Sequence, residues 1–73
     1  MANLKNTITP RQLEILNLVK SGYRDKAIAT ELSLSVGTIK SHLQNIFKRL
    51  RATNRTDAVI KAFKLGYLNI YRR

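Results

Sequence analysis

The sequence SVGTIKSHLQNIFKRL, residues 35–50, has the periodicity of one long helix. Its apolar residues recur every three or four positions, so at about 100° per residue they occupy a single arc of roughly 100°. Ser35 stands at the N-cap position, where its hydroxyl can accept a hydrogen bond from the backbone N–H of Gly37 or Thr38. The apolar arc consists of Val36, Ile39, Leu43, Ile46, Phe47 and Leu50. We therefore predict a helix over 36–50 with one buried side.

The opposite side of this helix carries no acidic residue. It combines small residues, amides and basic groups, an unusual mixture for a helix surface that meets only water. The residues on this side are Gly37, Ser41, Gln44, Asn45 and Lys48. We expect this side of the helix to face a partner.

The composition indicates one small basic domain. The chain has 73 residues, no cysteine and a formal net charge of +10, from 14 Lys and Arg against 4 Asp and Glu. Such an excess favours a polyanionic partner, either nucleic acid or an anionic membrane surface. No acid occurs between residues 32 and 56, so the basic excess is centred on the long helix and the turn after it. No apolar run reaches the roughly 20 residues of a membrane span and the N-terminus lacks a signal peptide, so we expect a cytoplasmic protein.

Two shorter helices are expected before the long one. The sequence TPRQ at 9–12 has the pattern of a helix start with a capping box, which predicts a flexible arm over 1–8 and a first helix over 10–21, ended by Gly22. A second helix over 25–33 has the small residue Ala29 on its inward side. Because only a short turn separates it from the long helix, the two must cross sharply, which is helix-turn-helix geometry. The first helix is expected to bury Ile15, Leu16, Leu18 and Val19.

The last helix is predicted over 54–65, with Thr53 as N-cap and Gly66 after its end. Its apolar residues cover roughly 220° of the helix, against the roughly 100° that facing one core requires. The surplus favours a homodimer formed through this helix. The residues expected at the dimer interface are Val59, Ile60, Phe63 and Leu65. The tail 67–73 alternates as a strand does, but it is short, and we expect it to pack against the last helix.

Several short motifs occur in one register along the chain. They include Thr9-Pro10-Arg11, Gly22, Lys26-Ala27-Ile28-Ala29, Leu34-Ser35, Thr38-Ile39-Lys40, Ala58-Val59 and Gly66. In these residues the stretch 8–68 resembles the LuxR-type (GerE-type) helix-turn-helix domain of bacterial transcription regulators. The resemblance implies an all-α domain of four helices over 9–73. It also implies that the third helix enters the major groove of double-stranded DNA and that the fourth commonly forms a dimer contact.

The chain departs from the family pattern at three places. Gln12 replaces an acid whose charge could pair with Arg55. Arg24 stands where a Ser or Thr cap is usual, so we expect Asp25 to cap the second helix. Arg51 replaces the glycine that normally ends the third helix. None of these positions lies on the outward side of the long helix, so they bear on stability more than on binding.

The docking geometry of helix-turn-helix domains assigns roles to the outward residues. The N-terminal part of the recognition helix meets base edges, while its flanks and later residues meet phosphates. We expect base contacts from Lys40, Ser41 and Gln44, because lysine suits guanine acceptors and glutamine can pair with adenine through two hydrogen bonds. Contacts to the DNA backbone are expected from Lys26, Thr38, Asn45, Lys48 and Arg49.

The sequence does not indicate catalysis, a metal site or a cofactor. The single histidine, His42, has no cysteine or second histidine with which to share a metal. The four acids lie on separate predicted elements and lack paired-carboxylate spacing. We therefore expect no enzyme activity, no metal, no cofactor and no small-molecule ligand.

Three alternatives to DNA binding differ in support. Membrane binding is disfavoured because the chain has no tryptophan and the long helix needs its apolar residues for the core. RNA binding is disfavoured because no aromatic stacking platform accompanies the basic residues. An antagonist that heterodimerises with a larger LuxR-type regulator through the last helix has more support. In such an antagonist we would expect the DNA-contacting residues of the long helix to be replaced, whereas Thr38, Lys40 and Gln44 are present here.

Overall fold

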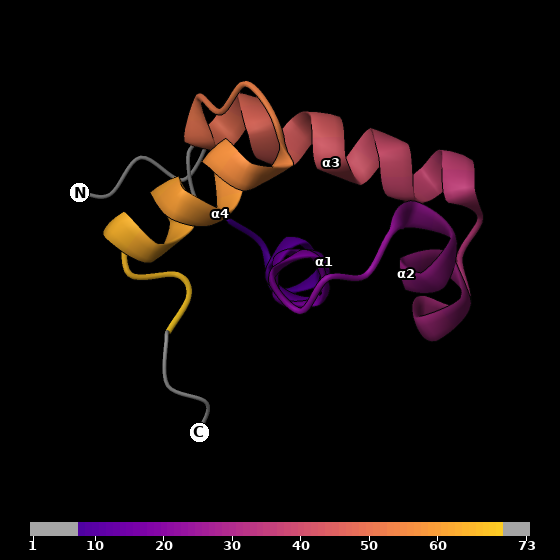
Figure 1. Cartoon of the computed structure of the whole chain (residues 1–73). Helices are drawn as coiled ribbons and strands as arrows, with labels where there is room; N and C mark the ends of the chain where they lie inside the picture. Colours follow the sequence, from indigo (N-terminus) through magenta and orange to yellow (C-terminus); the bar gives the residue numbers. More distant parts are fainter. Residues whose placement is uncertain (1–7, 70–73) are drawn as a thin grey trace.

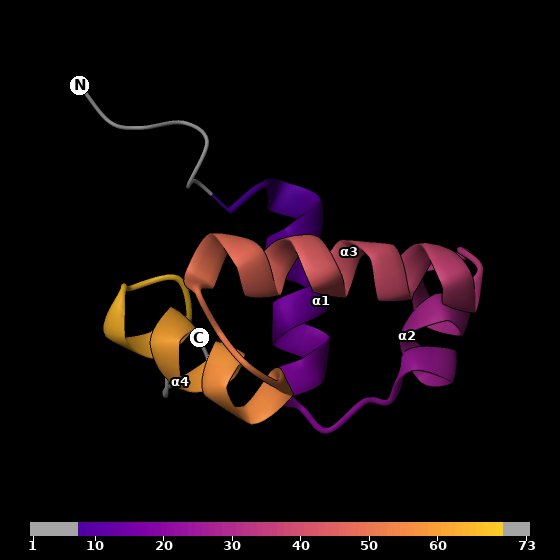
Figure 2. The same ribbon diagram turned by 90° about the horizontal axis from the view of Figure 1, so that it is seen from above.

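Helices α1 and α3 cross at the centre of the domain, and α2 and α4 lie near the two ends of α3 (Figure 1, Figure 2). The computed structural model describes residues 8–69, which form four helices and no strand. These are α1 (Pro10–Lys20), α2 (Asp25–Leu32), α3 (Val36–Leu50) and α4 (Arg55–Lys64). Helix α3 packs against each of the other three. The all-α prediction and the central place of residues 36–50 are therefore confirmed.

The start of α1 is the capping box that the sequence predicts. Thr9 Oγ1 accepts from the backbone N–H of Gln12 at 3.1 Å, and Gln12 Oε1 accepts from the Thr9 N–H at 3.0 Å. The helix ends at Lys20, one residue before the predicted end. Gly22 then takes a left-handed φ of +94°, and the backbone N–H of Tyr23 donates to the Leu18 carbonyl at 2.9 Å. This closure is the expected glycine stop.

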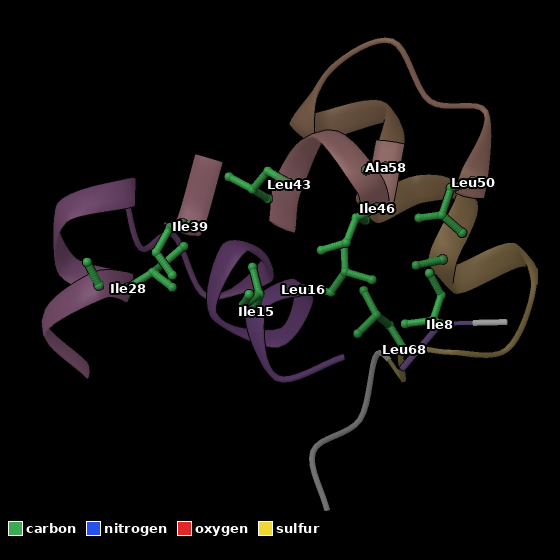
Figure 3. Packing of buried hydrophobic residues seen from close by; sticks show 12 residues of the cluster. Ile8, Ile15, Leu16, Ile28, Ile39, Leu43, Ile46, Leu50, Ala58 and Leu68 are labelled. Atoms are coloured by element: carbon green, nitrogen blue, oxygen red, sulfur yellow. The ribbon is translucent and has the colours of Figure 1, made fainter. Parts of the chain in front are cut away.

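One apolar cluster runs beneath α3 (Figure 3). Five side chains in it are fully buried, and each contributes roughly 1.5–3 kcal/mol of transfer free energy. They are Ile15, Leu16, Ile28, Ile39 and Ile46. Leu18 and Val19, which we expected inside, are only partly buried and pack against the edge of the cluster. Ala58 and Ala62 of α4 complete it, and their small side chains allow α4 to lie close to α3.

The packed domain begins one residue earlier than the sequence predicts. Ile8, assigned to the arm over 1–8, is buried in the core near Leu68 (Figure 3). It precedes the N-cap of α1, where an apolar residue often packs back on the first helical turn. Residues 1–7 of the arm and residues 70–73 of the tail lie outside the described residues. Within the described tail, the Tyr67 N–H donates to the Ala62 carbonyl at 2.8 Å, so this part packs against α4 as expected.

Helix α2 begins at Asp25 as predicted, but its end and its N-cap differ from the prediction. It stops at Leu32 instead of residue 33, because Ser33 takes the left-handed conformation with φ of 58°. Asp25 does not cap the helix. The N-cap is Arg24, whose side chain makes no capping hydrogen bond. The Asp25 carboxylate instead accepts a hydrogen bond from the Arg55 guanidinium, so the carboxylate that was expected to cap the helix forms an ion pair.

Helix α4 is capped one residue later than predicted. Asn54 is the N-cap, and its Oδ1 accepts from the Asp57 N–H at 2.8 Å. Thr53, the expected cap, donates its own backbone N–H to the Asp57 carboxylate at 2.9 Å. The helix ends at Lys64, and Leu65 serves as its C-cap. The prediction of 54–65 is therefore one residue too long at each end.

Candidate nucleic-acid interface

The outer side of α3 is uncovered along its length, with the other three helices beneath it or beside it (Figure 2). The three residues expected to read bases, Lys40, Ser41 and Gln44, are all exposed on this side. They occupy successive turns, so the fold brings them together as the sequence predicts. The exposed residues of α3 are Val36, Gly37, Lys40, Ser41, Gln44, Asn45 and Lys48.

Val36 is a correction to the predicted apolar arc. Its side chain is 37% exposed, whereas Ile39, Leu43 and Ile46 are buried. At 100° per residue, Val36 lies about 50° from the centre of the buried arc. It is also the first residue of the helix, so no earlier turn shields it.

The first turn of α3 is held by Ser35. Its Oγ accepts from the Thr38 N–H at 3.0 Å and donates to Thr38 Oγ1 at 2.9 Å. Thr38 is half-buried and acts as the acceptor in the second bond. Its own hydroxyl hydrogen can therefore be offered to a phosphate oxygen, the role expected for it.

The other residues that are expected to contact the DNA backbone differ in their exposure to solvent. Asn45 and Lys48 are exposed on α3, and Arg49 is half-buried on its flank. Lys26 is exposed near the start of α2. Helix α2 lies at the end of the domain where α3 begins (Figure 2). The fold thus distributes these residues along α3 and α2 instead of gathering them at one point.

An open hollow of about 460 Å³ lies between α3 and the start of α4. Lys40 and Gln44 line one side of it, and Asn54 and Arg55 line the other. Asp25 also borders the hollow, so an acid stands beside two of the residues that are expected to read bases. Its charge is balanced by Arg55, which in addition donates from Nη1 to the Tyr23 carbonyl at 3.4 Å. The sequence prediction missed this pair, because it considered a partner for Arg55 only on α1.

Asp57 and Glu14 each have a basic partner nearby. The backbone N–H of Thr53 holds the pKa of the Asp57 carboxyl below its usual 3.8, and Lys61 at 3.3 Å adds to the effect. On α1, Glu14 pairs with Arg11 at 3.4 Å. The positive charge of Lys40 and Lys48 on the outer side of α3 is therefore not offset by an adjacent unpaired acid of α4.

Helix α4 leaves part of its apolar side uncovered. Ile60 is 47% exposed and Leu65 is 63% exposed, while Val59 and Phe63 are half-buried against the core. Of the four residues expected at a dimer interface, two are therefore exposed to solvent and two are partly buried in the core.

Residues 8–69 hold neither a helix that could span a membrane nor a cluster of metal ligands. None of the helices within 8–69 combines the length and the apolar content that crossing a bilayer requires. In the same residues, the His, Cys, Asp and Glu side chains do not form a group of three that could hold a metal ion.

A short helix joined by a tight turn to a longer helix, whose outer side is open, polar and basic, defines a helix-turn-helix domain of the DNA-binding kind. The chain belongs to the luxR family of bacterial regulatory proteins, because the GerE model of that family matches residues 6–62. The resemblance noted from the sequence motifs is thereby confirmed. Members of this family are regulators and not enzymes.

Full-length response regulators contain a similar domain. The chain is 40% identical over 63 residues to the response regulator protein VraR of Staphylococcus aureus and of Staphylococcus epidermidis, a match that covers 86% of this chain and 30% of VraR. It also resembles the crystal structure of ChrA, the response regulator of a heme-sensing two-component system. That match has a TM-score of 0.83 at 31% identity and covers 85% of this chain and 31% of ChrA. The chain thus spans about 30% of the length of the relatives it matches.

Proposed function

We propose that this chain binds double-stranded DNA sequence-specifically as a homodimer, and that it regulates transcription in the bacterial cytoplasm. The observation that carries the proposal is the open outer side of α3, where Lys40, Ser41 and Gln44 are exposed together. Membership of the luxR family supports DNA binding. The net charge of +10 supports attraction to a phosphate backbone.

The α3 residues divide into two roles in this proposal. Lys40, Ser41 and Gln44 contact base edges in the major groove, because they lie in the part of α3 that a recognition helix inserts. Phosphates are contacted by the residues around them, which fix the register of the helix without reading sequence. These are Lys26, Thr38, Asn45, Lys48 and Arg49.

The homodimer in this proposal forms through α4. Ile60 and Leu65 supply exposed apolar surface that a second copy would cover, and Val59 and Phe63 border it. A symmetric pair of domains would present two α3 helices to two half-sites, as the proposal requires.

The test begins with selection of bound sequences from a random DNA pool at physiological salt. Gln44→Ala should then relax the preference at one base pair of each half-site, with a loss of about 1–3 kcal/mol of discrimination there. The readout is the affinity for the selected site and for variants of that site. Equal losses on specific and random DNA would contradict base reading through Gln44.

Lys48→Ala is the matched control for a backbone contact. It should weaken binding to all sequences alike and reduce the slope of log affinity against log salt by about one. An unchanged slope would remove Lys48 from the proposed phosphate contacts.

The same uncovered side of α4 supports the second candidate, an antagonist that heterodimerises with a larger LuxR-type regulator. The exposed Ile60 and Leu65 would serve such a pairing equally well. A chain that selects no DNA sequence, yet forms a complex with a purified LuxR-type regulator and releases that regulator from its operator, would favour the antagonist over the DNA-binding homodimer.

A further inference from the structure

Val36 is an apolar residue on an otherwise polar exposed side. Its side chain is 37% exposed, although valine is among the residues most often buried. The other exposed large apolar side chains within 8–69 are Tyr23, Ile60 and Leu65, all outside α3. A single exposed apolar side chain is common and means little by itself. Its position, in the first turn of a recognition helix and one turn before Lys40, gives it more weight.

Gly37 provides a second and independent observation. A Cβ at this position would meet only Ser35 Oγ, at 3.8 Å, which is ordinary contact. Its φ is not positive, unlike that of Gly22 or Gly66. Glycine weakens a helix relative to alanine, so neither the backbone nor the internal packing explains it here. Close approach of another molecule to the first turn of α3 would explain it.

We propose that Val36 packs against the 5-methyl group of a thymine in the major groove, and that Gly37 allows the groove edge to approach the first turn of α3. This inference rests on the proposed function, because it requires α3 to lie in the groove. The thymine methyl is the apolar group that bases display there. Val36 offers two methyl groups and no polar side-chain atom, so it can distinguish thymine by this contact alone.

The geometry of the helix limits where the thymine lies. Val36 precedes Lys40 by four residues, which is about 6 Å along the helix axis. Base pairs are spaced by about 3.4 Å. The thymine therefore lies within about two base pairs of the base pair that Lys40 reads.

Deoxyuridine tests this contact, because it keeps every hydrogen-bonding group of thymine and lacks only the methyl. Each thymine of the selected operator is replaced in turn, in both half-sites, and the Kd of the 73-residue chain is measured by fluorescence anisotropy. For the unmodified protein, one replacement should weaken binding about fourfold per half-site, the effect of losing one buried methyl. For Val36→Ala, the same replacement should have almost no effect.

Val19→Ala is the matched control, since it removes the same atoms from a half-buried valine of α1 and should keep the fourfold sensitivity. Circular dichroism checks that all variants are folded. Gly37→Ala supplies a second readout: it should bind the operator several-fold more weakly with an unchanged or higher thermal midpoint. Tighter or equal operator binding by Gly37→Ala would contradict the close approach.

The outcomes distinguish this inference from the function on which it rests. If the chain selects an operator but the methyl effect is absent, or persists in Val36→Ala, the thymine contact is overturned while the proposed function stands. If the chain selects no sequence, both fall. A methyl effect that only Val36→Ala abolishes supports the contact.

Discussion

Arg51→Gly should stabilise the domain, because Arg51 ends α3 in the left-handed conformation, with φ of 55° and ψ of 43°. This conformation costs a residue other than glycine about 1–2 kcal/mol. Glycine has more conformational freedom in the unfolded chain, which offsets about 0.5–1 kcal/mol of that gain. The net stabilisation is therefore expected to be about 0.5–1 kcal/mol. Two backbone bonds at this turn, from the Arg51 N–H to Lys48 and from the Ala52 N–H to Phe47, do not involve the side chain and should persist.

The assay is urea unfolding followed by circular dichroism. For a small domain the urea dependence is about 1 kcal/mol per molar, so the midpoint should rise by roughly 0.5–1 M. The thermal midpoint should rise by a few degrees, at about 4–8 °C per kcal/mol. DNA affinity is expected to fall at the same time, because the substitution removes a positive charge near the proposed DNA surface.

Two comparison variants separate the backbone effect from the loss of charge. Arg51→Ala removes the charge but keeps the strain, so it should not show the gain. Ser33→Gly relieves a second left-handed residue, with φ of 58°, and should stabilise by a similar amount. The reasoning would be refuted if Arg51→Gly unfolded at no higher urea concentration than Arg51→Ala.

Two further predictions concern α4. Ile60→Glu should leave the monomer folded and reduce cooperative binding to an operator with two half-sites, as measured by gel shift. An unfolded variant, or unchanged cooperativity, would contradict the proposed position of the interface. The pKa of the Asp57 carboxyl in the folded protein lies below its usual value of 3.8. The ionised carboxylate therefore stabilises the fold above pH 3.8, and this stabilisation is lost as pH falls through the lower folded pKa. Asp57→Asn should therefore lose less stability than the unmodified protein on acidification from about pH 4 to 2 in thermal melts, and equal losses would contradict the prediction.

Much of the fold follows from local signals in the sequence. The capping box at Thr9 and Gln12 and the stop at Gly22 involve neighbours in the chain, so sequence spacing alone was enough to find them. The left-handed Arg51 was anticipated because the family pattern places glycine there. The exposure of Lys40, Ser41 and Gln44 followed from helical periodicity. Their proposed roles toward DNA are still predictions.

The predictions of helix caps and of burial were wrong where the structure depends on residues distant in sequence, on two adjacent residues that both suit a cap, or on position at a helix end. Asp25 left its expected capping role because Arg55, 30 residues away in sequence, reaches it in the folded chain. Thr53 and Asn54 both suit an N-cap, and local geometry selected Asn54. Val36 fits the apolar period but stands at a helix end, where periodicity does not ensure burial. Ile8 shows that one apolar residue before a cap can belong to the core.

Arg55 connects two parts of the domain that do not otherwise pack together. Helices α2 and α4 share no packed surface in the described residues, yet Arg55 at the first turn of α4 holds Asp25 and the Tyr23 carbonyl at the start of α2. If two copies pair through α4, the orientation of each reading helix relative to the two-fold axis is fixed partly by this fork of hydrogen bonds. The number of base pairs between the half-sites of an operator would then depend on a residue that reads none of them. A lysine at position 55 would keep the charge but not the planar fork, so a change of spacing could evolve there without a change in the bases preferred.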